Sequence, residues 1–362
     1  MASVNDEHKL SISVLIPLTG LKAIDETVDS VIKQKYSADE IIILRNDIKE
    51  LPEDIEFVEI SDKVQPFREV FIQKRGKGNA LNIGISLAAG ELICVLDADC
   101  MLDDNALMNI VGHFKDESVV AAGGRLSVIQ RNRKLIVKVQ NYEYIRTFQI
   151  TRNVFATLNA QCLISGAFGV FRKSSLMEVN GYDTDTVGED MEMVLRLQNS
   201  GLKRSEGRII YEPESVCYTG TPETLGRLFH QRDRWQRGLL DCLIKHANML
   251  FNPVFGFLGM FALPYQFVLE LLGPLWSLLY FVWPTFRDMF PQSWLIYFVY
   301  VNIEVLIGIY AVFMDVNRSV LRLIKKLPEI VLLTLLEILI QIPVSIARLW
   351  GMISFPWRRL VW

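Results

Sequence analysis

The sequence lacks the features that typify nucleic-acid-binding and zinc-binding proteins. Its 38 basic residues are outnumbered by 41 acidic ones and form no dense tract, which argues against nucleic acid as a partner. The 5 cysteines include no C-x-x-C pair, so we expect reduced thiols and no structural zinc site. The opening MASVNDEHKL is polar, so neither a secretory signal nor a leading membrane span is expected. These absences predict that the first half of the chain stays in the cytoplasm.

The apolar residues are distributed unevenly. Hydrophobic residues make up 51% of the chain, and residues 251–362 contain most of the long Phe, Leu and Trp runs. Ser293–Met314 is the clearest candidate for a membrane span, because it is long, apolar and almost free of charge. Phe255–Trp283 is longer and is broken by prolines, so it is either an interfacial helix leading into a span or one kinked span.

Leu327–Ala347 is a third candidate span, interrupted by polar residues and a proline. The segment before it is expected to be a loop and carries several cations: Arg318, Arg322, Lys325 and Lys326. Cationic loops stay on the cytoplasmic side of a membrane. The alternative is that these apolar segments are core helices of a second soluble domain, although Trp and Tyr residues at their edges favour lipid.

The first half of the chain alternates short apolar runs with segments of helical spacing. The apolar runs are predicted to be buried strands: Ser13–Leu18, Glu40–Leu44, Glu56–Ile60 and Glu91–Leu96. Asp25–Lys35 and Asn79–Ala89 carry apolar residues three and four apart, which predicts helices. This alternation is typical of an α/β fold with a doubly wound sheet, which binds ligands at the carboxyl ends of its strands.

Asp97 and Asp99 directly follow the apolar run that ends at Leu96. Two carboxylates at a strand end can share one Mg²⁺ or Mn²⁺, with a diphosphate completing the coordination shell. The alternative is an acidic turn that caps the next helix. The strongly apolar strand in front favours the metal site.

Small residues mark two further segments. The RGKGN segment around Lys77 opens a predicted helix, whose free N–H groups and nearby cations would attract an anion; the alternative is a solvated turn. The SGAFG segment that starts at Ser165 and Gly166 would let a sugar approach the backbone closely; here the alternative is a strand with packing glycines.

Glu189 and Asp190 precede a predicted helix, Met191–Asn199. A carboxylate at this place can take a proton from an attacking hydroxyl. It can equally cap the helix, and spacing alone does not separate the two roles.

A later helix is predicted to begin at Thr221 as its N-cap. Gln231, Arg234 and Trp235 are spaced i, i+3 and i+4 within it, so they lie on one face. Arg234 can hold a phosphate through its planar guanidinium, and the indole of Trp235 can stack on a sugar ring. The alternative is a basic amphipathic helix on anionic lipid, with these arginines extended toward the headgroups: Arg227, Arg232 and Arg237.

Together these motifs resemble those of the processive family 2 glycosyltransferases, the synthases of cellulose, hyaluronan and poly-N-acetylglucosamine. The order is the same: a nucleotide-binding strand, the segment around Lys77, D-x-D, the S-G segment, E-D, Q-x-x-R-W and membrane helices. The likeness covers roughly residues 11–285. It is closest to the poly-β-1,6-N-acetylglucosamine synthase type, in SGAFGVFRKSSLMEVNGYDTDTVGEDMEMVLRL and QRDRWQRG. In this family Q-x-x-R-W separates polymer-making members from single-transfer relatives.

The resemblance implies a glycosyltransferase-A-like α/β domain with a doubly wound mixed sheet, followed by C-terminal transmembrane helices. Asp97 would contact the nucleotide and Asp99 the metal, Mg²⁺ or Mn²⁺. Lys77 would touch uridine or diphosphate, and Gln231 and Arg234 would bind the diphosphate.

The acceptor side is implied in the same way. Asp190 would be the general base, with Glu189 beside it. Trp235 would bind the terminal sugar of the acceptor, and Ser165 and Gly166 would belong to the acceptor segment.

The sequence departs from the family pattern after its second predicted strand. The family usually has D-D-G-S there, with an Asp that reads uracil, whereas this chain has LRND. We therefore expect Asn46 or Asp47 to take over the contact with the base.

The resemblance implies an inverting membrane-bound transferase that adds sugar from UDP-GlcNAc or UDP-glucose to a growing β-linked polysaccharide. Residues 1–221 would form the cytosolic nucleotide-sugar-binding domain, residues 222–252 an interfacial helix, and residues 253–362 a membrane domain of two to four helices. Membrane lipid and an export or regulatory subunit are expected partners, at a bacterial-type plasma (inner) membrane. Two alternatives stay open: a single-transfer enzyme acting on a lipid carrier, and a catalytically silent membrane scaffold.

Overall fold

A computed structural model describes residues 9–19, 24–46, 57–59, 67–72, 76–129, 134–204, 207–282, 293–315, 319–358 and 360. The chain divides into two compact units. The first contains Met1–Gly124, Ile164–Thr184 and Arg196–Cys217, and the second contains Arg125–Leu163, Asp185–Leu195 and Tyr218–Trp362.

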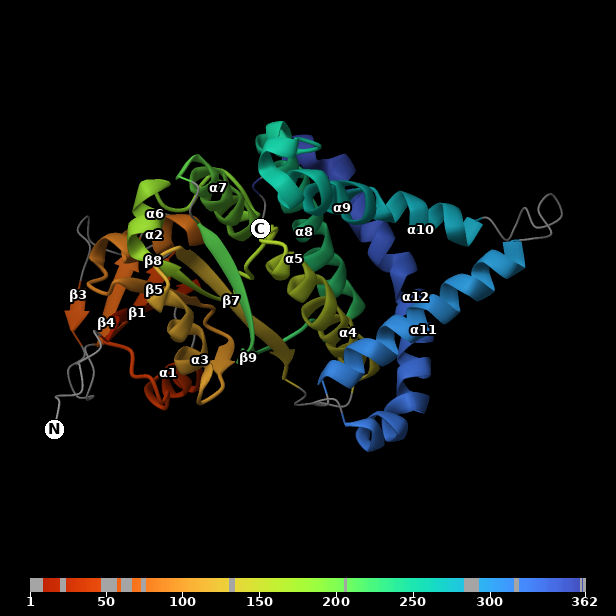
Figure 1. Ribbon diagram of the computed structural model, residues 1–362, viewed down its shortest axis with the longest axis horizontal. Coiled ribbons are helices and arrows are strands. Elements are labelled where there is room, and N and C mark those ends of the chain that lie inside the picture. The colour runs from red at the N-terminus through yellow and green to blue at the C-terminus, as the bar shows by residue number, and fades with distance from the viewer. Residues whose placement is uncertain are drawn as a thin grey trace. The chain divides into compact units, whose positions relative to one another are not determined.

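A mixed nine-stranded sheet forms the centre of the first unit, in the order β3-β4-β2-β1-β5-β8-β7-β9-β6 (Figure 1). β1 pairs in parallel with β2 and β5, and β2 with β4, whereas β3 and β8 run antiparallel to their neighbours. The predicted mixed α/β sheet is confirmed. The strands are β1 Ile12–Thr19, β2 Glu40–Asn46, β3 Phe57–Glu59, β4 Phe67–Ile72, β5 Leu92–Leu96, β6 Cys100–Leu102, β7 Val119–Val128, β8 Phe168–Arg172 and β9 Arg208–Thr219.

The central strands are buried along nearly their whole length. In β1 and β5 every residue before the strand end is buried, which is the pattern of a parallel strand covered on both faces and explains the apolar runs. The sequence predicts no strand at β4, because Phe67–Ile72 mixes charged and apolar residues. After Leu96, where β6 to β9 lie, it offers a strand only as the alternative for the SGAFG segment.

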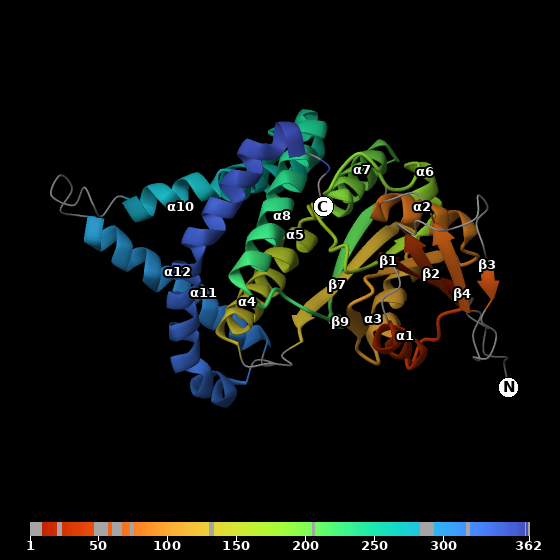
Figure 2. The same ribbon diagram turned by 180° about the vertical axis from the view of Figure 1, so that it is seen from behind.

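Helices cover both faces of this sheet. Figures 1 and 2 show α1 (Asp25–Ile32) and α3 (Ala106–Val111) on one side of the strands, and α2 (Lys77–Leu87) and α6 (Lys173–Glu178) on the other. α2 begins earlier than the predicted Asn79–Ala89. Its N-cap Gly76 has φ 117°, a conformation that favours glycine, so the turn can form directly before Lys77.

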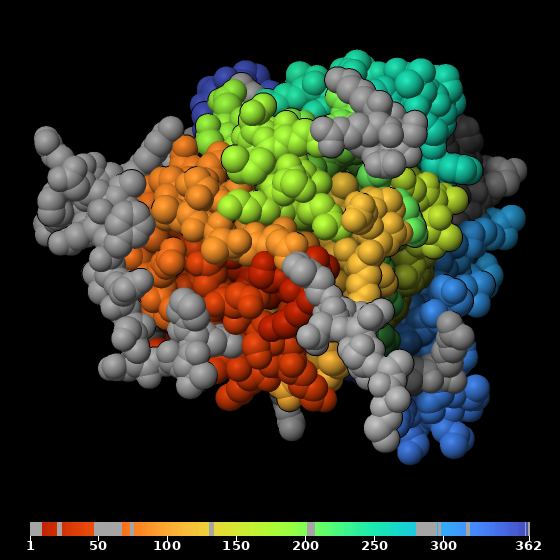
Figure 3. Space-filling model, turned by 60° about the vertical axis from the view of Figure 1, so that its left-hand side comes forward, coloured from red at the N-terminus to blue at the C-terminus, as the bar shows by residue number. Residues whose placement is uncertain are grey.

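Segments distant in the sequence meet along α2. Asn82 Nδ2 donates to Tyr182 O (2.8 Å), and Asn82 Oδ1 accepts from Tyr182 N (2.6 Å). A Cβ added to Gly78 would lie 3.0 Å from Asp183 O, so this approach depends on glycine. In Figure 3 the orange surface of the α2 region adjoins the yellow-green surface of these later residues.

The second unit is helical. α8 packs along α12, and α11 contacts both α4 and α12. Its elements are α4 Leu135–Arg146, the π-helix η2 Thr147–Arg152, α5 Asn153–Thr157, the start of α7 Glu189–Arg204, α8 Leu225–Lys245, η3 Ala247–Met249, η4 Pro253–Phe255, η5 Leu258–Ala262, α9 Leu263–Tyr265, η6 Gln266–Leu271, α10 Gly273–Val282, α11 Ser293–Asp315 and α12 Val320–Arg358.

Within the described part of the chain, two helices are long and apolar enough to cross a membrane, Phe298–Asp315 in α11 and α12 itself. Leu258–Leu271 and Gly273–Leu279 would be a third if this pair, bent by 44°, is one span. The outer face of α11 exposes large apolar side chains such as Phe298 and Leu306. A contiguous apolar surface of this kind suits contact with lipid.

The predicted third span is part of a longer helix. Leu327–Ala347 lies inside α12, so Arg322, Lys325 and Lys326 are helical and the predicted loop at these residues is wrong. The helix continues through Pro343, which is tolerated where neighbouring helices satisfy the carbonyl that proline leaves free. Arg318 lies outside the described residues.

A buried hydrogen-bond network joins β1, β2 and the turn before β5. Ser13 Oγ donates to Glu40 Oε1 (2.5 Å) and accepts from Gly90 N (2.8 Å). Glu40 Oε1 also accepts from Ala89 N (2.5 Å). A Cβ on Gly90 would lie 2.6 Å from Ser13 N, so glycine is required here. The network fixes the start of the strand that leads to Asp97.

Replacing Ser13 with alanine should therefore destabilise the protein. The Ser13→Ala variant leaves the buried Gly90 N–H without its acceptor, which should lower the free energy of unfolding by about 1–3 kcal/mol. Thermal unfolding in detergent measures the change. Ser86→Ala is the control, since its exposed hydroxyl bonds only its own helix at Ile83 O. Equal stability of the two variants would contradict the prediction.

Candidate active site

The turn that carries Asp97 and Asp99 follows β5 and leads into β6. Asp97 N donates to Ala167 O (3.0 Å), and Cys100 N donates to Asp97 O (3.0 Å). Thr27 Oγ1 of α1 donates to Ala98 O (2.8 Å) and holds the turn from the other side. Because a strand follows at Cys100, the alternative that this acidic turn caps the next helix is wrong.

Lys77 joins three of the predicted motifs. As the first residue of α2, it donates from Nζ to Asp97 Oδ1 (2.5 Å) and to Gly166 O (2.8 Å). The ammonium and the carboxylate are both partly exposed, with side-chain exposures of 18% and 33%. Lys77, Asp97 and Gly166 therefore form one polar cluster at the end of β5.

Asp99 lies beside this cluster and is exposed to solvent. Surrounding protein nevertheless withdraws water from its carboxyl group, and this desolvation raises the pKa of Asp99, with the neighbouring Asp97 charge adding to the shift. A divalent cation would offset the repulsion between the two carboxylates. The described residues contain no group of three or more His, Cys, Asp or Glu that could hold a metal, so a cation here needs further oxygens from a ligand. That requirement fits a diphosphate.

Asn46 ends β2 at the same carboxyl edge of the sheet. It is buried, and its Oδ1 accepts from Thr19 Oγ1 (3.2 Å) at the end of the neighbouring β1. Asp47 lies outside the described residues. Ser165 and Gly166 lie in the loop before β8, and Phe168–Arg172 forms that strand, so the SGAFG segment is part loop and part strand.

Glu189 and Asp190 form the first turn of α7 in the second unit. Glu189 is buried, with 6% of its surface exposed. Asp190 Oδ1 accepts from Met191 N (2.9 Å), and acids in a first turn are favoured by the helix dipole. The two carboxylates are thus held at a helix N-terminus that packs against α8 through Gly188 and Gly238.

α8 carries the Q-x-x-R-W motif. It begins later than predicted, because Thr224 and not Thr221 is the N-cap and accepts from Arg227 N (3.4 Å). Trp235 is 41% exposed. Gln231 Oε1 is buried and has no hydrogen-bond partner among the residues that the structure describes. Buried polar atoms are normally paired, so this carbonyl is suited to a ligand group that donates a hydrogen bond.

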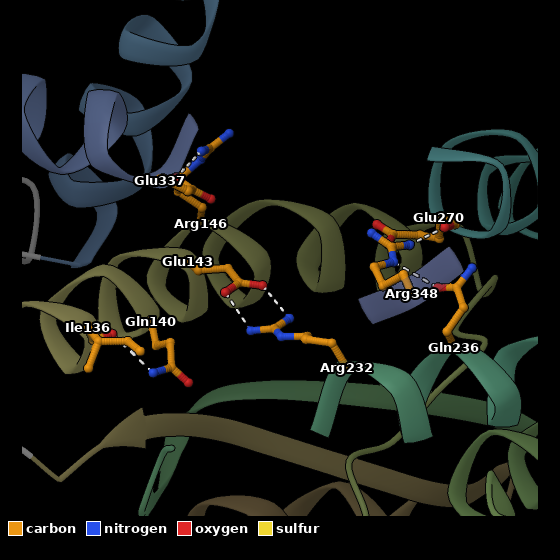
Figure 4. A network of polar contacts seen from close by, with 9 residues as sticks. All are labelled: Ile136, Gln140, Glu143, Arg146, Arg232, Gln236, Glu270, Glu337 and Arg348. Carbon is orange, nitrogen blue, oxygen red and sulfur yellow. Dashed lines mark hydrogen bonds and ion pairs between the residues drawn. The ribbon is translucent and has the colours of Figure 1, made fainter. Parts of the chain in front are cut away.

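Two of the α8 arginines face protein. Arg232 donates from both terminal nitrogens to Glu143 of α4 (2.7 Å each), as Figure 4 shows. Arg237 donates to Arg358 O (2.7 Å) and to Asp233 Oδ2 (3.2 Å). Both arginines are buried, so the alternative that they extend into lipid is wrong for them; Arg227 is exposed.

Sequence patterns did not reveal two residues that support the site, Glu143 and Thr27. Arg232 lies over the Trp235 ring, with its guanidinium carbon 4.6 Å from the ring centroid. By holding this guanidinium in place, Glu143 supports its cation–π contact with the indole of Trp235. Thr27 supports the D-x-D turn. Their partners are more than 70 positions away in the chain, so no local pattern could have identified them.

Removing Glu143 should destabilise the second unit. The Glu143→Gln variant leaves the buried Arg232 guanidinium without its carboxylate, and we expect a loss of about 2–3 kcal/mol, below the value for a fully buried pair. Glu143 is 28% exposed, which reduces the cost. Thermal unfolding provides the measurement.

Glu223→Gln is the matched control, because Glu223 bonds Lys134 at 2.6 Å with both side chains about half exposed. Its loss should cost less than about 1 kcal/mol. Equal losses of stability in the two variants would show that the Arg232–Glu143 pair stabilises the protein no more than an exposed ion pair does.

Comparisons with known proteins identify relatives of this chain. The chain is 30% identical over 254 residues to the poly-beta-1,6-N-acetyl-D-glucosamine synthase of Staphylococcus aureus (strain COL), covering 67% of this chain and 59% of that protein. The synthase of Staphylococcus epidermidis (strain ATCC 35984) is 31% identical over 225 residues, covering 62% and 53%. The chain thus spans between half and two thirds of the length of these curated relatives.

A solved mannosyltransferase, PcManGT from Pyrobaculum calidifontis in complex with GDP-Man and Mn²⁺, is similar in fold. Its TM-score is 0.60 at 17% identity, covering 98% of this chain and 89% of that chain. The family model Glycosyl transferase family group 2 matches residues 92–313. Because this match covers more than half of the sequence, the chain belongs to that glycosyltransferase family.

Proposed function

We propose that this protein is a membrane-bound glycosyltransferase that transfers a sugar from a UDP-sugar, UDP-GlcNAc or UDP-glucose, to the end of a growing β-linked polysaccharide. The observation that carries the proposal is the cluster of Lys77, Asp97 and Gly166, since it joins three family motifs at the end of one strand. The 30% identity to poly-beta-1,6-N-acetyl-D-glucosamine synthases supports a polymeric product.

Asp97 and Asp99 would hold Mg²⁺ or Mn²⁺, which neutralises the charge that develops on the leaving diphosphate. Lys77 contributes a positive charge beside the same phosphates. Gln231 and Arg234 bind the diphosphate. Gln231 donates from the N–H groups of its side-chain amide, and Arg234 donates from its guanidinium. Asn46 or Asp47 contacts the base.

Asp190 is the proposed general base, with Glu189 beside it. Its carboxylate takes the proton from an acceptor hydroxyl, whose oxygen attacks the anomeric carbon from the face opposite the diphosphate, so the configuration inverts. Trp235 stacks on the terminal acceptor sugar and supplies orientation. Ser165 and Gly166 leave room for the acceptor.

In the proposed organisation, residues 1–221 bind the nucleotide sugar in the cytoplasm, residues 222–252 lie at the membrane surface and residues 253–362 enter the membrane. Support comes from helices α11 and α12, which are long and apolar enough to cross a bilayer. The proposed site is a bacterial-type plasma membrane, where lipid and an export or regulatory subunit would be partners.

Asp190→Asn should almost abolish polymer synthesis. An amide cannot accept the proton, and loss of a general base lowers rates by about 10²–10⁴-fold. The measurement is radiolabel incorporated from UDP-GlcNAc and UDP-glucose into insoluble polymer by protein in detergent. Unchanged incorporation would remove Asp190 from this role. A short product extractable into organic solvent would indicate transfer to a lipid carrier, and UDP binding without turnover would indicate a silent scaffold.

Removing the divalent cation should weaken UDP binding. With chelator present, or in the Asp97→Asn and Asp99→Asn variants, the diphosphate loses its bridge to the protein, so we expect at least a 10-fold rise in Kd, about 1.4 kcal/mol. Calorimetric titration of UDP with and without Mn²⁺ measures it. Metal-independent UDP affinity in the unaltered protein would contradict the assignment.

A further inference from the structure

One face of α8 carries a continuous row of residues from the Q-x-x-R-W motif toward the helix end. The row follows helical spacing of three and four, and its members are Gln231, Trp235, Gly238, Cys242 and His246. The first two belong to the proposed site. The other three are buried and have no part in the proposed chemistry.

Gly238 brings the backbone of α8 against the residue that precedes α7. A Cβ added to Gly238 would lie 3.0 Å from Gly188 Cα and 3.2 Å from Gly188 N. A Cβ added to Gly188 would lie 2.9 Å from Gly238 Cα. Each of these contacts is with backbone, which cannot rotate away as a side chain can. The two backbone segments therefore approach so closely that a Cβ on Gly188 would clash, and one on Gly238 would force the neighbouring backbone to give by a few tenths of an ångström.

Further contacts along the row hold the same segment. Cys242 Sγ donates to Gly188 O (3.3 Å). Burial, and next the nearby Asp190 charge, raise the pKa of the Cys242 thiol, so the group keeps the proton that it donates. His246 Nε2 lies 3.4 Å from Glu192 Oε1 in the first turn of α7, and both side chains are almost completely buried. Lys245 Nζ donates to Asp185 O (2.7 Å).

These contacts link Asp190 to Trp235 through few residues. Asp190 is two positions after Gly188, and Trp235 is one helical turn before Gly238. α8 is an uninterrupted helix from Leu225 to Lys245, so the contact at Gly238 fixes the first turn of α7 relative to the indole. Such a short, backbone-to-backbone link has little freedom to stretch.

We propose that Gly188, Gly238 and Cys242 are positioning residues that hold the base-bearing turn at Asp190 in register with the acceptor-binding Trp235. The proposal rests on the proposed function. The glycine pair sets how closely the two elements approach, and the Cys242 hydrogen bond sets their relative slide along the α8 axis. Loss of this register should therefore slow the transfer of sugar to the acceptor. UDP binding is assigned to Asp97, Asp99 and Lys77 and, on α8, to Gln231 and Arg234. None of these residues lies on the base-bearing turn of α7, so displacement of that turn should leave UDP binding intact.

Gly238→Ala tests the proposal, with Gly226→Ala as a matched control. Both change glycine to alanine within α8, but a Cβ at Gly226 meets nothing within 4 Å. The added Cβ would force the neighbouring backbone to give by a few tenths of an ångström. Since a displacement of about 1 Å costs up to about 100-fold in rate, Gly238→Ala should lower kcat by about 3–10-fold. Gly226→Ala should stay within about twofold of the unaltered protein. Equal kcat for the two variants would overturn the proposal.

UDP affinity distinguishes a positioning defect in Gly238→Ala from loss of folding. In Gly238→Ala the Kd for UDP with Mn²⁺ and the KM for the donor should change by less than about threefold, while kcat falls and polymer chains shorten. A parallel loss of UDP affinity and transfer would indicate a general structural defect and would overturn the positioning role.

Substitutions of Cys242 provide an independent test if Gly238→Ala does not fold. Cys242→Ser keeps a donor for Gly188 O, whereas Cys242→Ala has nearly the same volume as the serine variant and no donor. We expect Cys242→Ala to lose about 5–10-fold in kcat, because a buried carbonyl without a donor favours displacement of the turn. Cys242→Ser should retain more activity. Equal loss in both would overturn the hydrogen bond's part in positioning.

The unaltered protein distinguishes failure of this proposal from failure of the proposed function. If it forms no polymer from either UDP-sugar, the proposed function fails. If it forms polymer, Asp190→Asn does not, and Gly238→Ala behaves as Gly226→Ala does, then the function stands and only the positioning proposal fails.

Discussion

One ammonium group holds together the first part of the candidate site. Lys77 Nζ bonds the Asp97 carboxylate and the Gly166 carbonyl at the same time, so the start of α2, the end of β5 and the loop before β8 share one point. A charge withdrawn from water must be paired to be tolerated, and here each pairing also fixes a backbone segment. The Asp97 amide bonded to Ala167 O reinforces the same meeting point.

The helical unit depends on paired charges in more apolar surroundings. Arg146 of α4 bonds Glu304 of α11 and, at 2.5 Å, Glu337 of α12, and the latter pair is drawn in Figure 4. Tyr142 bonds Thr334 nearby (2.7 Å). Charges between helices that can enter a membrane are costly unless they are paired in this way. Apolar helix surfaces alone permit sliding, so these polar contacts give the helices one register.

The accuracy of sequence-based prediction differed between elements for identifiable reasons. β1, β2 and β5 were predictable because parallel strands buried on both faces are apolar throughout. α8 was placed correctly but its start was not, since Thr221 and Thr224 offer equal hydroxyl groups and only the folded backbone selects Thr224. α12 extends through Lys325, Lys326 and Pro343, where composition favoured a break. The neighbouring helices override that local preference.

The sequence by itself determined the chemical groups and their order: carboxylates at the end of an apolar strand, a lysine at a helix start, and a glutamine, arginine and tryptophan on one helical face. Spacing of three and four residues or a strand end is a local property, so it can be read from neighbours in the chain. Only the tertiary structure decided that Lys77 bonds Asp97, that Glu143 supports Arg232 and that Gly188 meets Gly238. Those contacts join residues far apart in the chain, and their formation depends on packing of whole elements.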